Sequence, residues 1–434
     1  MMNSAIVQPG EPETTGRYIV TFREDGHTEG LAALKKSAGL TKAKMMSSAD
    51  FGASGIDLSQ LAADGGAVLE HLGIAVVNID PNAAGAMALE AGEDSAILSI
   101  EPEGVMYALS DLSGVTTDYL RGFRDAAQSL YAAAVPDQAG EYGAEIEAAF
   151  ADTAALTWGL LATKAGASKF SGQGINVAIL DTGLFLAHPD FTGRQIISKS
   201  FIAGVASAND GHGHGTHCTG TACGPLKPAL GRRYGIAHKA LIHIGKVLSD
   251  QGSGSDGGIL AGIERAIANN CQIISMSLGA DVPTSTVAYE TAGQRALNAG
   301  TLIVAAASNN ADRKAGDFGF VGRPANSRTF MAVGALDNRL RIANFSPRDI
   351  AHAAGTAVDI AAPGVDVFSS WPMPTRNRII NGTSMATPHV AGIAALWAQA
   401  TGARGAALWQ QLIVNARGIT LSSADVGRGL VQAP

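Results

Sequence analysis

The chain carries an aspartate, a histidine and a serine at positions from which their side chains could act together on a carbonyl carbon. Asp181 directly follows a short apolar run, His214 lies in the glycine-rich segment 211–224, and Ser384 lies near the start of segment 381–400. A serine hydroxyl becomes a strong nucleophile only when a base takes its proton, and a carboxylate fixes the tautomer of an imidazole base. These three residue types therefore predict nucleophilic acyl transfer.

Two further features could stabilise the negative charge that develops on a carbonyl oxygen in such a reaction. Segment 381–400 begins with polar and glycine residues and then turns helical, which puts Ser384 among the free amides of a first helical turn. Asn309 follows the apolar run 301–307 and offers a side-chain amide. Its neighbour Asn310 is a rival for this role, but the register with the run favours Asn309.

The elements that must position these residues are a parallel sheet and its covering helices. Several short runs are continuous, apolar and rich in branched residues, as in strands buried on both faces, and the stretches between them have helical periodicity. This alternation predicts an α/β fold with a doubly wound, mostly parallel sheet, whose carboxyl edge gathers the polar residues that follow the strands. The expected strands are 175–180, 240–247, 272–278, 301–307 and 330–336, and the expected helices include 258–270 and 286–300.

The chain divides into three parts by pattern. Residues 15–110 alternate short apolar runs with small helical patterns, which predicts a separate α+β domain with helices on one face of an antiparallel sheet. Residues 111–153 are rich in alanine and acidic residues and are interpreted as a helical connector. The α/β domain is expected to occupy residues 154–434.

Three segments resemble the signature segments of the subtilase family of serine endopeptidases: ILDTGL around Asp181, HGTHCTGT from His214, and NGTSMATPHVAG around Ser384. Their order along the chain is also that of this family. The resemblance covers residues 154–434 and implies that Asp181 orients His214, which is the general base and acid, while Ser384 attacks. It also implies that Asn309 and the Ser384 amide hold the oxyanion.

The resemblance further implies where a substrate binds. An extended peptide is expected to add as a strand between two edges of a cleft, so that main-chain hydrogen bonds give broad specificity. Gly322 leaves the main pocket open at its base, which predicts a preference for large apolar residues before the cut. Asp256 stands where relatives often present an aromatic side chain, and it predicts a basic residue further upstream. The expected substrate-binding residues are Gly252, Ser253 and Gly254 on one edge, Ser277, Leu278 and Gly279 on the other, and Gly322.

The amino-terminal domain is similar to the family's inhibitory, ferredoxin-like propeptide in its pattern of elements. We therefore expect a zymogen whose first domain acts in cis, assists folding and blocks the cleft. Because the strand pattern at 96–109 runs into an apolar tail that fits a cleft, we expect the enzyme itself to cut between Tyr107 and Ser110.

Two other classes of function stay open in the sequence. His212, His214 and His217 have a spacing that could ligate zinc, as in a metallohydrolase, although neither a fourth ligand nor a nearby acid is obvious. A catalytically silent subtilase acting as a binding or inhibitory module is disfavoured, because every polar catalytic position is filled. We interpret His217 and His389 as buried structural residues.

Composition limits the partners. The formal net charge of −7 in 434 residues is spread without a basic stripe, so no nucleic acid partner is expected. No apolar run could span a bilayer and no secretory layout opens the chain, so we expect no membrane partner, and a cytoplasmic location unless a removed leader directs secretion. Cys218, Cys223 and Cys271 are expected to be free, buried thiols.

We expect a monomer that acts on protein or peptide substrates and requires no metal or other cofactor. The loop 224–235 carries lysine and arginines where many relatives place oxygen ligands for calcium. Calcium, if it binds, is therefore expected at a site that the sequence does not identify.

Overall fold

Seven parallel strands form the central sheet of the larger of two bodies, in the order β14-β13-β12-β10-β6-β8-β7. The computed structural model describes residues 13–37, 45–61, 65–109, 149–348 and 357–434, so most of the predicted connector lies outside the described residues. The order of strands reverses about β6, whose carboxyl end lies where such sheets bind ligands. The strands are β6 (Asn176–Asp181), β7 (Ile196–Ser200), β8 (Leu241–Lys246), β10 (Ile273–Met276), β12 (Leu302–Ala306), β13 (Met331–Leu336) and β14 (Ile360–Pro363).

Helices cover both faces of this sheet and divide its core in two, which confirms the predicted α/β fold. Successive strand residues point to opposite faces, so Ile179 packs in one cluster with α5 and α8, and Leu180 in another with α6 and α7. The side chains of Ser255 and Thr286 cap the amino termini of α6 and α7. The helices are α4 (Trp158–Ala162), α5 (His214–Cys223), α6 (Asp256–Ala268), α7 (Val287–Asn298), α8 (Thr383–Thr401), α9 (Gly405–Val414) and α10 (Ser423–Val426), and the hairpin β15 (Val367–Ser370) and β16 (Asn377–Ile380) precedes α8.

The smaller body follows the order β–α–β–β–α–β through β1, α1, β3, β4, α2 and β5, which is that of a ferredoxin-like unit. One face of its mainly antiparallel sheet, with Val20 and Phe22, packs on α1 and α2. The opposite face, with Ile19 and Ile74, packs on α6 and α7 of the larger body. Its elements are β1 (Thr14–Phe22), α1 (His27–Ser37), β2 (Met45–Ser47), β3 (Gly66–Leu69), β4 (Ile74–Val77), α2 (Pro81–Glu90) and β5 (Ile97–Ala108).

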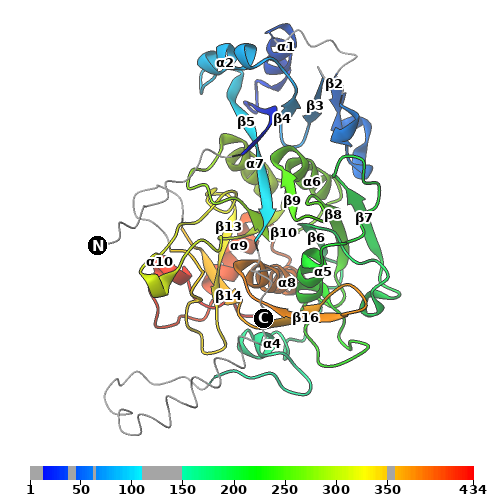
Figure 1. The fold of residues 1–434 in the computed structure, drawn as a ribbon, viewed down its shortest axis with the longest axis vertical. Coiled ribbons are helices and arrows are strands. Elements are labelled where there is room, and N and C mark those ends of the chain that lie inside the picture. Colours follow the sequence, from blue (N-terminus) through cyan, green and yellow to red (C-terminus); the bar gives the residue numbers. More distant parts are fainter. Residues whose placement is uncertain (1–12, 38–44, 62–64, 110–148, 349–356) are drawn as a thin grey trace, which may run out of the picture.

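Strand β5 joins the two bodies. Along most of its length it pairs antiparallel with β1, and at its end it also lies between two short strands of the larger body, β9 (Ser253–Ser255) and β11 (Leu278–Gly279). Figure 1 shows β5 running from the upper body down into the lower one. No described helix combines the length and the apolar character that a membrane span requires.

Candidate active site

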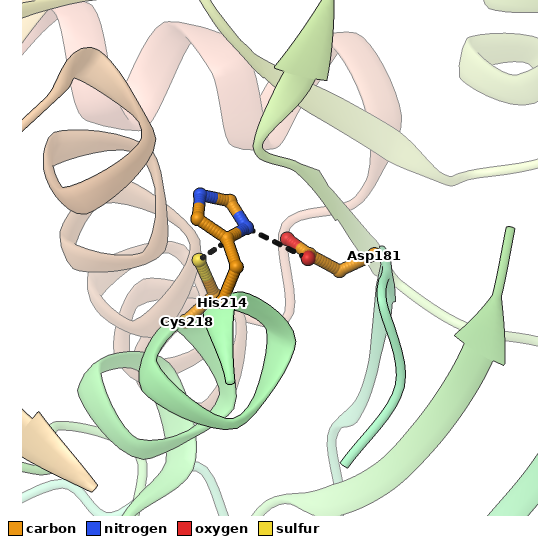
Figure 2. Close-up of side chains that lie close together, drawn as sticks. All are labelled: Asp181, His214 and Cys218. Atoms are coloured by element: carbon orange, nitrogen blue, oxygen red, sulfur yellow. Dashed lines mark hydrogen bonds and ion pairs between the residues drawn. The ribbon is translucent and has the colours of Figure 1, made fainter. Parts of the chain in front are cut away.

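Asp181 and His214 form a buried, hydrogen-bonded pair. Asp181 is the last residue of β6, and His214 is the first residue of α5. His214 Nδ1 lies 2.8 Å from Asp181 Oδ1 (Figure 2), and both side chains are buried. The backbone N–H of Thr182 also donates to Asp181 Oδ1, at 2.7 Å. The carboxylate is thus fixed and in turn orients the imidazole.

Gly213 shapes the turn that presents His214. Its φ of 106° lies in the left-handed region that residues with a side chain rarely adopt. A Cβ added there would lie 2.4 Å from an atom of the Trp371 ring. Backbone and space both therefore require glycine before this histidine.

The electrostatics of His214 favour its protonated form. Burial lowers the pKa of the imidazole, but the adjacent Asp181 carboxylate outweighs burial and holds that pKa well above its usual range. Nε2 of the ring points away from Asp181 in Figure 2 and has no hydrogen-bond partner among the described residues. Nε2 is therefore the atom that can exchange a proton with a nucleophile.

Cys218 lies one turn after His214 on α5. Its Sγ is 4.0 Å from His214 Nδ1, and the ligating atoms of Asp181, His214 and Cys218 lie within 4.8 Å of one another (Figure 2). Burial raises the pKa of the thiol, which therefore stays protonated and is a poor metal ligand. All three cysteines are free and buried, so this expectation is confirmed.

The three-histidine metal site is not formed. His217 Nε2 lies 3.0 Å from the carbonyl oxygen of Val367, and His214 Nδ1 is engaged by Asp181. Burial lowers the pKa of His217 to about 3 and that of His389 to about 4, so both are neutral. His389 donates through Nδ1 to a backbone carbonyl one turn earlier in α8, at 2.8 Å. The structural interpretation of His217 and His389 is confirmed.

Ser384 is buried in the first turn of α8, close to the pair of Asp181 and His214. Its hydroxyl donates to the carbonyl oxygen of Ser277 at 3.2 Å, and the Ser277 hydroxyl donates to the carbonyl oxygen of Ser384 at 2.8 Å. Cys218 Sγ lies between His214 and Ser384, since it is 4.0 Å from His214 Nδ1 and 3.5 Å from the Ser384 carbonyl oxygen. No hydrogen bond joins Ser384 to His214 within the described part of the chain.

Asn309 is held with its amide nitrogen facing the end of β5. Its Oδ1 accepts hydrogen bonds from the Thr383 backbone N–H, at 2.9 Å, and from the Thr383 hydroxyl, at 3.0 Å. Its Nδ2 then donates to the carbonyl oxygen of Leu109 at 2.9 Å. Thr383 is a positioning residue that sequence reasoning missed, although its place directly before Ser384 was a usable signal.

The expected substrate-binding strips lie on either side of β5. Ala108 donates its N–H to the carbonyl oxygen of Gly252 at 2.8 Å, and Leu109 donates to that of Ser277 at 3.5 Å. On one side Tyr107 and Met106 pair with Ser253 and Gly254, and on the other Ala108 and Tyr107 pair with Leu278 and Gly279.

A cavity of about 300 Å³ lies beside Leu109 and is lined in part by Asn309 and Asp281. Asp281, which the sequence did not single out, accepts a hydrogen bond of 2.6 Å from the Ser308 hydroxyl, and Ser308 has a φ of 114°. A Cβ on Gly322 would lie 2.9 Å from that hydroxyl. Gly322 and Ser308 are thus neighbours, and the serine adds a polar group beside the glycine.

The environment of loop 224–235 does not fit a calcium site. Asp190, the buried carboxylate beneath it, accepts hydrogen bonds from the N–H of Ala229, at 2.9 Å, and from the hydroxyl of Tyr234, at 2.5 Å. The Arg376 guanidinium adds an ion pair at 3.2 Å. Because protein donors and a cationic side chain already surround Asp190, this carboxylate has no need of a metal ion.

The sequence is similar to those of several known proteins. A sequence profile described as the subtilase family matches residues 172–429. The chain is 38% identical to subtilisin DY of Bacillus licheniformis over 54% of its own length and 80% of that protein. It is 41% identical to subtilisin Savinase of Lederbergia lenta, over 56% of this chain and 83% of that protein. It is also 41% identical to the M-protease of Shouchella clausii, over 56% of this chain and 59% of that protein.

Proposed function

The chain belongs to the subtilase family of serine endopeptidases, and from this premise we propose that Ser384, His214 and Asp181 cut peptide bonds and that the chain is a self-processing zymogen. The observation that carries the proposal is the carbonyl oxygen of Leu109, 2.9 Å from Asn309 Nδ2 at the end of a strand paired on both sides. A peptide carbonyl aligned with a hydrogen-bond donor beside a serine is the arrangement that precedes attack.

In the proposed reaction, His214 Nε2 takes the proton of Ser384 as the hydroxyl oxygen attacks the carbonyl carbon. Asp181 stabilises the resulting imidazolium, in keeping with the raised pKa of His214. Asn309 Nδ2 and the backbone N–H of Ser384 stabilise the oxyanion. His214 then gives the proton to the leaving amine, and a water molecule, deprotonated by the same imidazole, hydrolyses the acyl-enzyme.

We infer that the bond after Leu109 is the first substrate. Of the stretch from Tyr107 to Ser110 that the sequence indicates, Leu109 is the residue whose carbonyl faces Asn309. The strand is also held as a substrate would be, because it adds to the edges β9 and β11 through main-chain pairing. The first domain blocks the cleft until this bond is cut and the domain is released.

Charged contacts between the two bodies support the inhibitory role of the smaller one. Glu103 of β5 accepts the N–H of Gly257 at 2.9 Å, in the first turn of α6. Glu101 accepts two N–H groups at the start of α7, at 3.1 and 3.0 Å. Carboxylates are favoured at helix amino termini, so these contacts stabilise the closed arrangement. In return, the buried Glu264 of α6 accepts the N–H of Leu72 at 3.1 Å.

We propose broad specificity with a preference for large apolar residues before the cut. The apolar Leu109 side chain supports this preference, and it lies beside the substrate-binding strip, since a Cβ on Gly279 would lie 3.0 Å from its Cδ1. Main-chain pairing along β5 supports tolerance at the other positions.

Replacing Ser384 with alanine tests the proposal. The variant should be purified as the full-length chain, while the wild type should be cut after Leu109, as mass spectrometry of both fragments would report. Ser423→Ala, which alters an exposed serine at the start of α10, is the matched control and should process like the wild type.

Continued cutting after Leu109 in the purified Ser384→Ala chain would exclude self-processing. Casein hydrolysis that a serine-directed sulfonyl fluoride blocks and a chelator does not would support the nucleophile. Casein hydrolysis lost to the chelator alone would favour a metallohydrolase, and a processed but inactive wild type would favour a silent binding module.

A further inference from the structure

Asp256 touches the strand that occupies the cleft, upstream of its pairing with β9. We propose that Asp256 is a specificity-determining residue that binds the backbone N–H of the sixth residue before the cut. This inference rests on the proposed function. The enzyme would then select extended substrates whose residue at that position is small and has a free N–H. If the cut follows Leu109, this residue is Gly104.

The main chain of the larger body changes from strand β9 to helix α6 opposite Gly104, so the Gly104 N–H needs a side-chain acceptor. Val105 pairs with Ser255, the last residue of β9, and α6 begins at the next residue, Asp256. Backbone carbonyls at the start of a helix accept helical hydrogen bonds, so the ladder cannot continue through the main chain. The Asp256 side chain takes over as acceptor, because the Gly104 N–H donates to its Oδ2 at 2.7 Å.

The carboxylate is fixed for this contact. Asp256 is 3% exposed, and Tyr289 of α7, itself buried, donates its hydroxyl to Asp256 Oδ1 at 2.7 Å. Tyr289 is therefore a positioning residue. Each carboxylate oxygen has a partner in the closed structure, and the basic residue that the sequence indicates upstream of the cut stays a prediction.

The hydrogen bond to Asp256 also limits the size of the side chain at the sixth position before the cut. A Cβ on Gly104 would lie 3.0 Å from Asp256 Oδ2, and Tyr289 restrains the carboxylate from moving away. The next amide along the strand behaves differently, since the Val105 N–H donates to the carbonyl oxygen of Glu13, in the smaller body, at 2.9 Å. On a separate substrate, therefore, the sixth amide would contact the enzyme and the fifth would not.

Peptides modified at single amides test this inference with the processed wild-type enzyme. The parent peptide has the sequence of residues 103–112, one analogue has N-methylglycine in place of Gly104, and the control has N-methylvaline in place of Val105. Hydrogen bonds to charged groups are strong enough that loss of the sixth N–H should lower kcat/KM about ten- to a hundredfold. The control should be hydrolysed like the parent.

Variants then assign the effect to Asp256. Asp256→Ala should hydrolyse the parent and the N-methylglycine peptide equally, whereas Asp256→Asn should retain the difference, because an amide oxygen still accepts the N–H. Equal hydrolysis of both peptides by the wild type would overturn the inference without reference to any variant. Failure of the wild type to cut any peptide would instead overturn the proposed function.

Discussion

Replacing Arg376 with alanine tests whether an internal ion pair, and no metal ion, satisfies the carboxylate beneath loop 224–235. The Asp190 side chain is 0% exposed and Arg376 Nη2 lies 3.2 Å from its Oδ1, so the variant leaves a buried charge with two neutral donors among the described residues. Removing one partner of a buried pair costs about 3–5 kcal/mol. Because Arg376 is itself 20% exposed, we expect the lower end of that range, about 3 kcal/mol.

The assay is urea unfolding of the full chain carrying Ser384→Ala, which prevents self-digestion. Tyr234→Phe should cost less, about 2 kcal/mol, because it removes one hydrogen bond to a charged group. Arg378→Ala is the matched control, since that guanidinium is exposed and stacks on Trp371, and it should cost under about 1 kcal/mol.

A chelator should not change the unfolding free energy of the chain that retains Arg376. The reasoning is refuted if Arg376→Ala costs no more than Arg378→Ala. A chelator that destabilises the chain with Asp190 but not an Asp190→Asn variant would likewise show that a metal ion holds this loop.

Three further predictions follow from the same contacts. Asn309→Ala should lower kcat about 10²–10³-fold with little change in KM, because it removes one oxyanion donor; an unchanged kcat for peptide hydrolysis would count against that role. Self-processing should accelerate about tenfold per pH unit from pH 5 to beyond 6.5, because a base whose pKa is raised must first lose its proton; a flat rate over that range would contradict the role of His214. Burial raises the pKa of Asp256 to about 6 in the closed state. The hydrogen bonds from Tyr289 and Gly104 and the charge of Arg323 oppose this rise, and the charge of Glu103 adds to it. Departure of the smaller body uncovers the side of Asp256 that Gly104 covers, so we expect a lower pKa in the open state and a release of the cut domain that increases as pH rises through about 6; equal release of the cut domain at pH 5 and pH 7 would exclude this linkage.

The residues that could be predicted are those whose place depends on local pattern. Asp181 follows an apolar strand and Ser384 opens a long helix, so the edge of a parallel sheet was a sufficient guide to their vicinity. The strands and helices that were expected in the larger body lie within a few residues of their predicted ranges for the same reason, whereas β7 and β14 were not predicted. The alternation of strands and helices in the smaller body also follows from its runs, although those runs did not indicate β3.

The contacts that could not be predicted join distant segments through single side chains. Arg376 contacts Asp190, which is 186 residues away in the sequence, and Tyr289 contacts Asp256, which is 33 residues away. No periodicity in the sequence indicates either contact. The partners of Asp256 in the closed structure, a phenol and a backbone amide, likewise could not be predicted from its residue type. The predicted domain boundaries and the connector 111–153 stay predictions.

Strand β5 belongs at once to the sheet of the smaller body and to the cleft of the larger one. The smaller body depends on α6 and α7 to cover one face of its sheet, so it gains stability from the body that it occupies. Departure would expose that apolar face to water and weaken its fold. Release of such a domain would be effectively irreversible, because once displaced it would lose the folded structure that it needs to bind the cleft again.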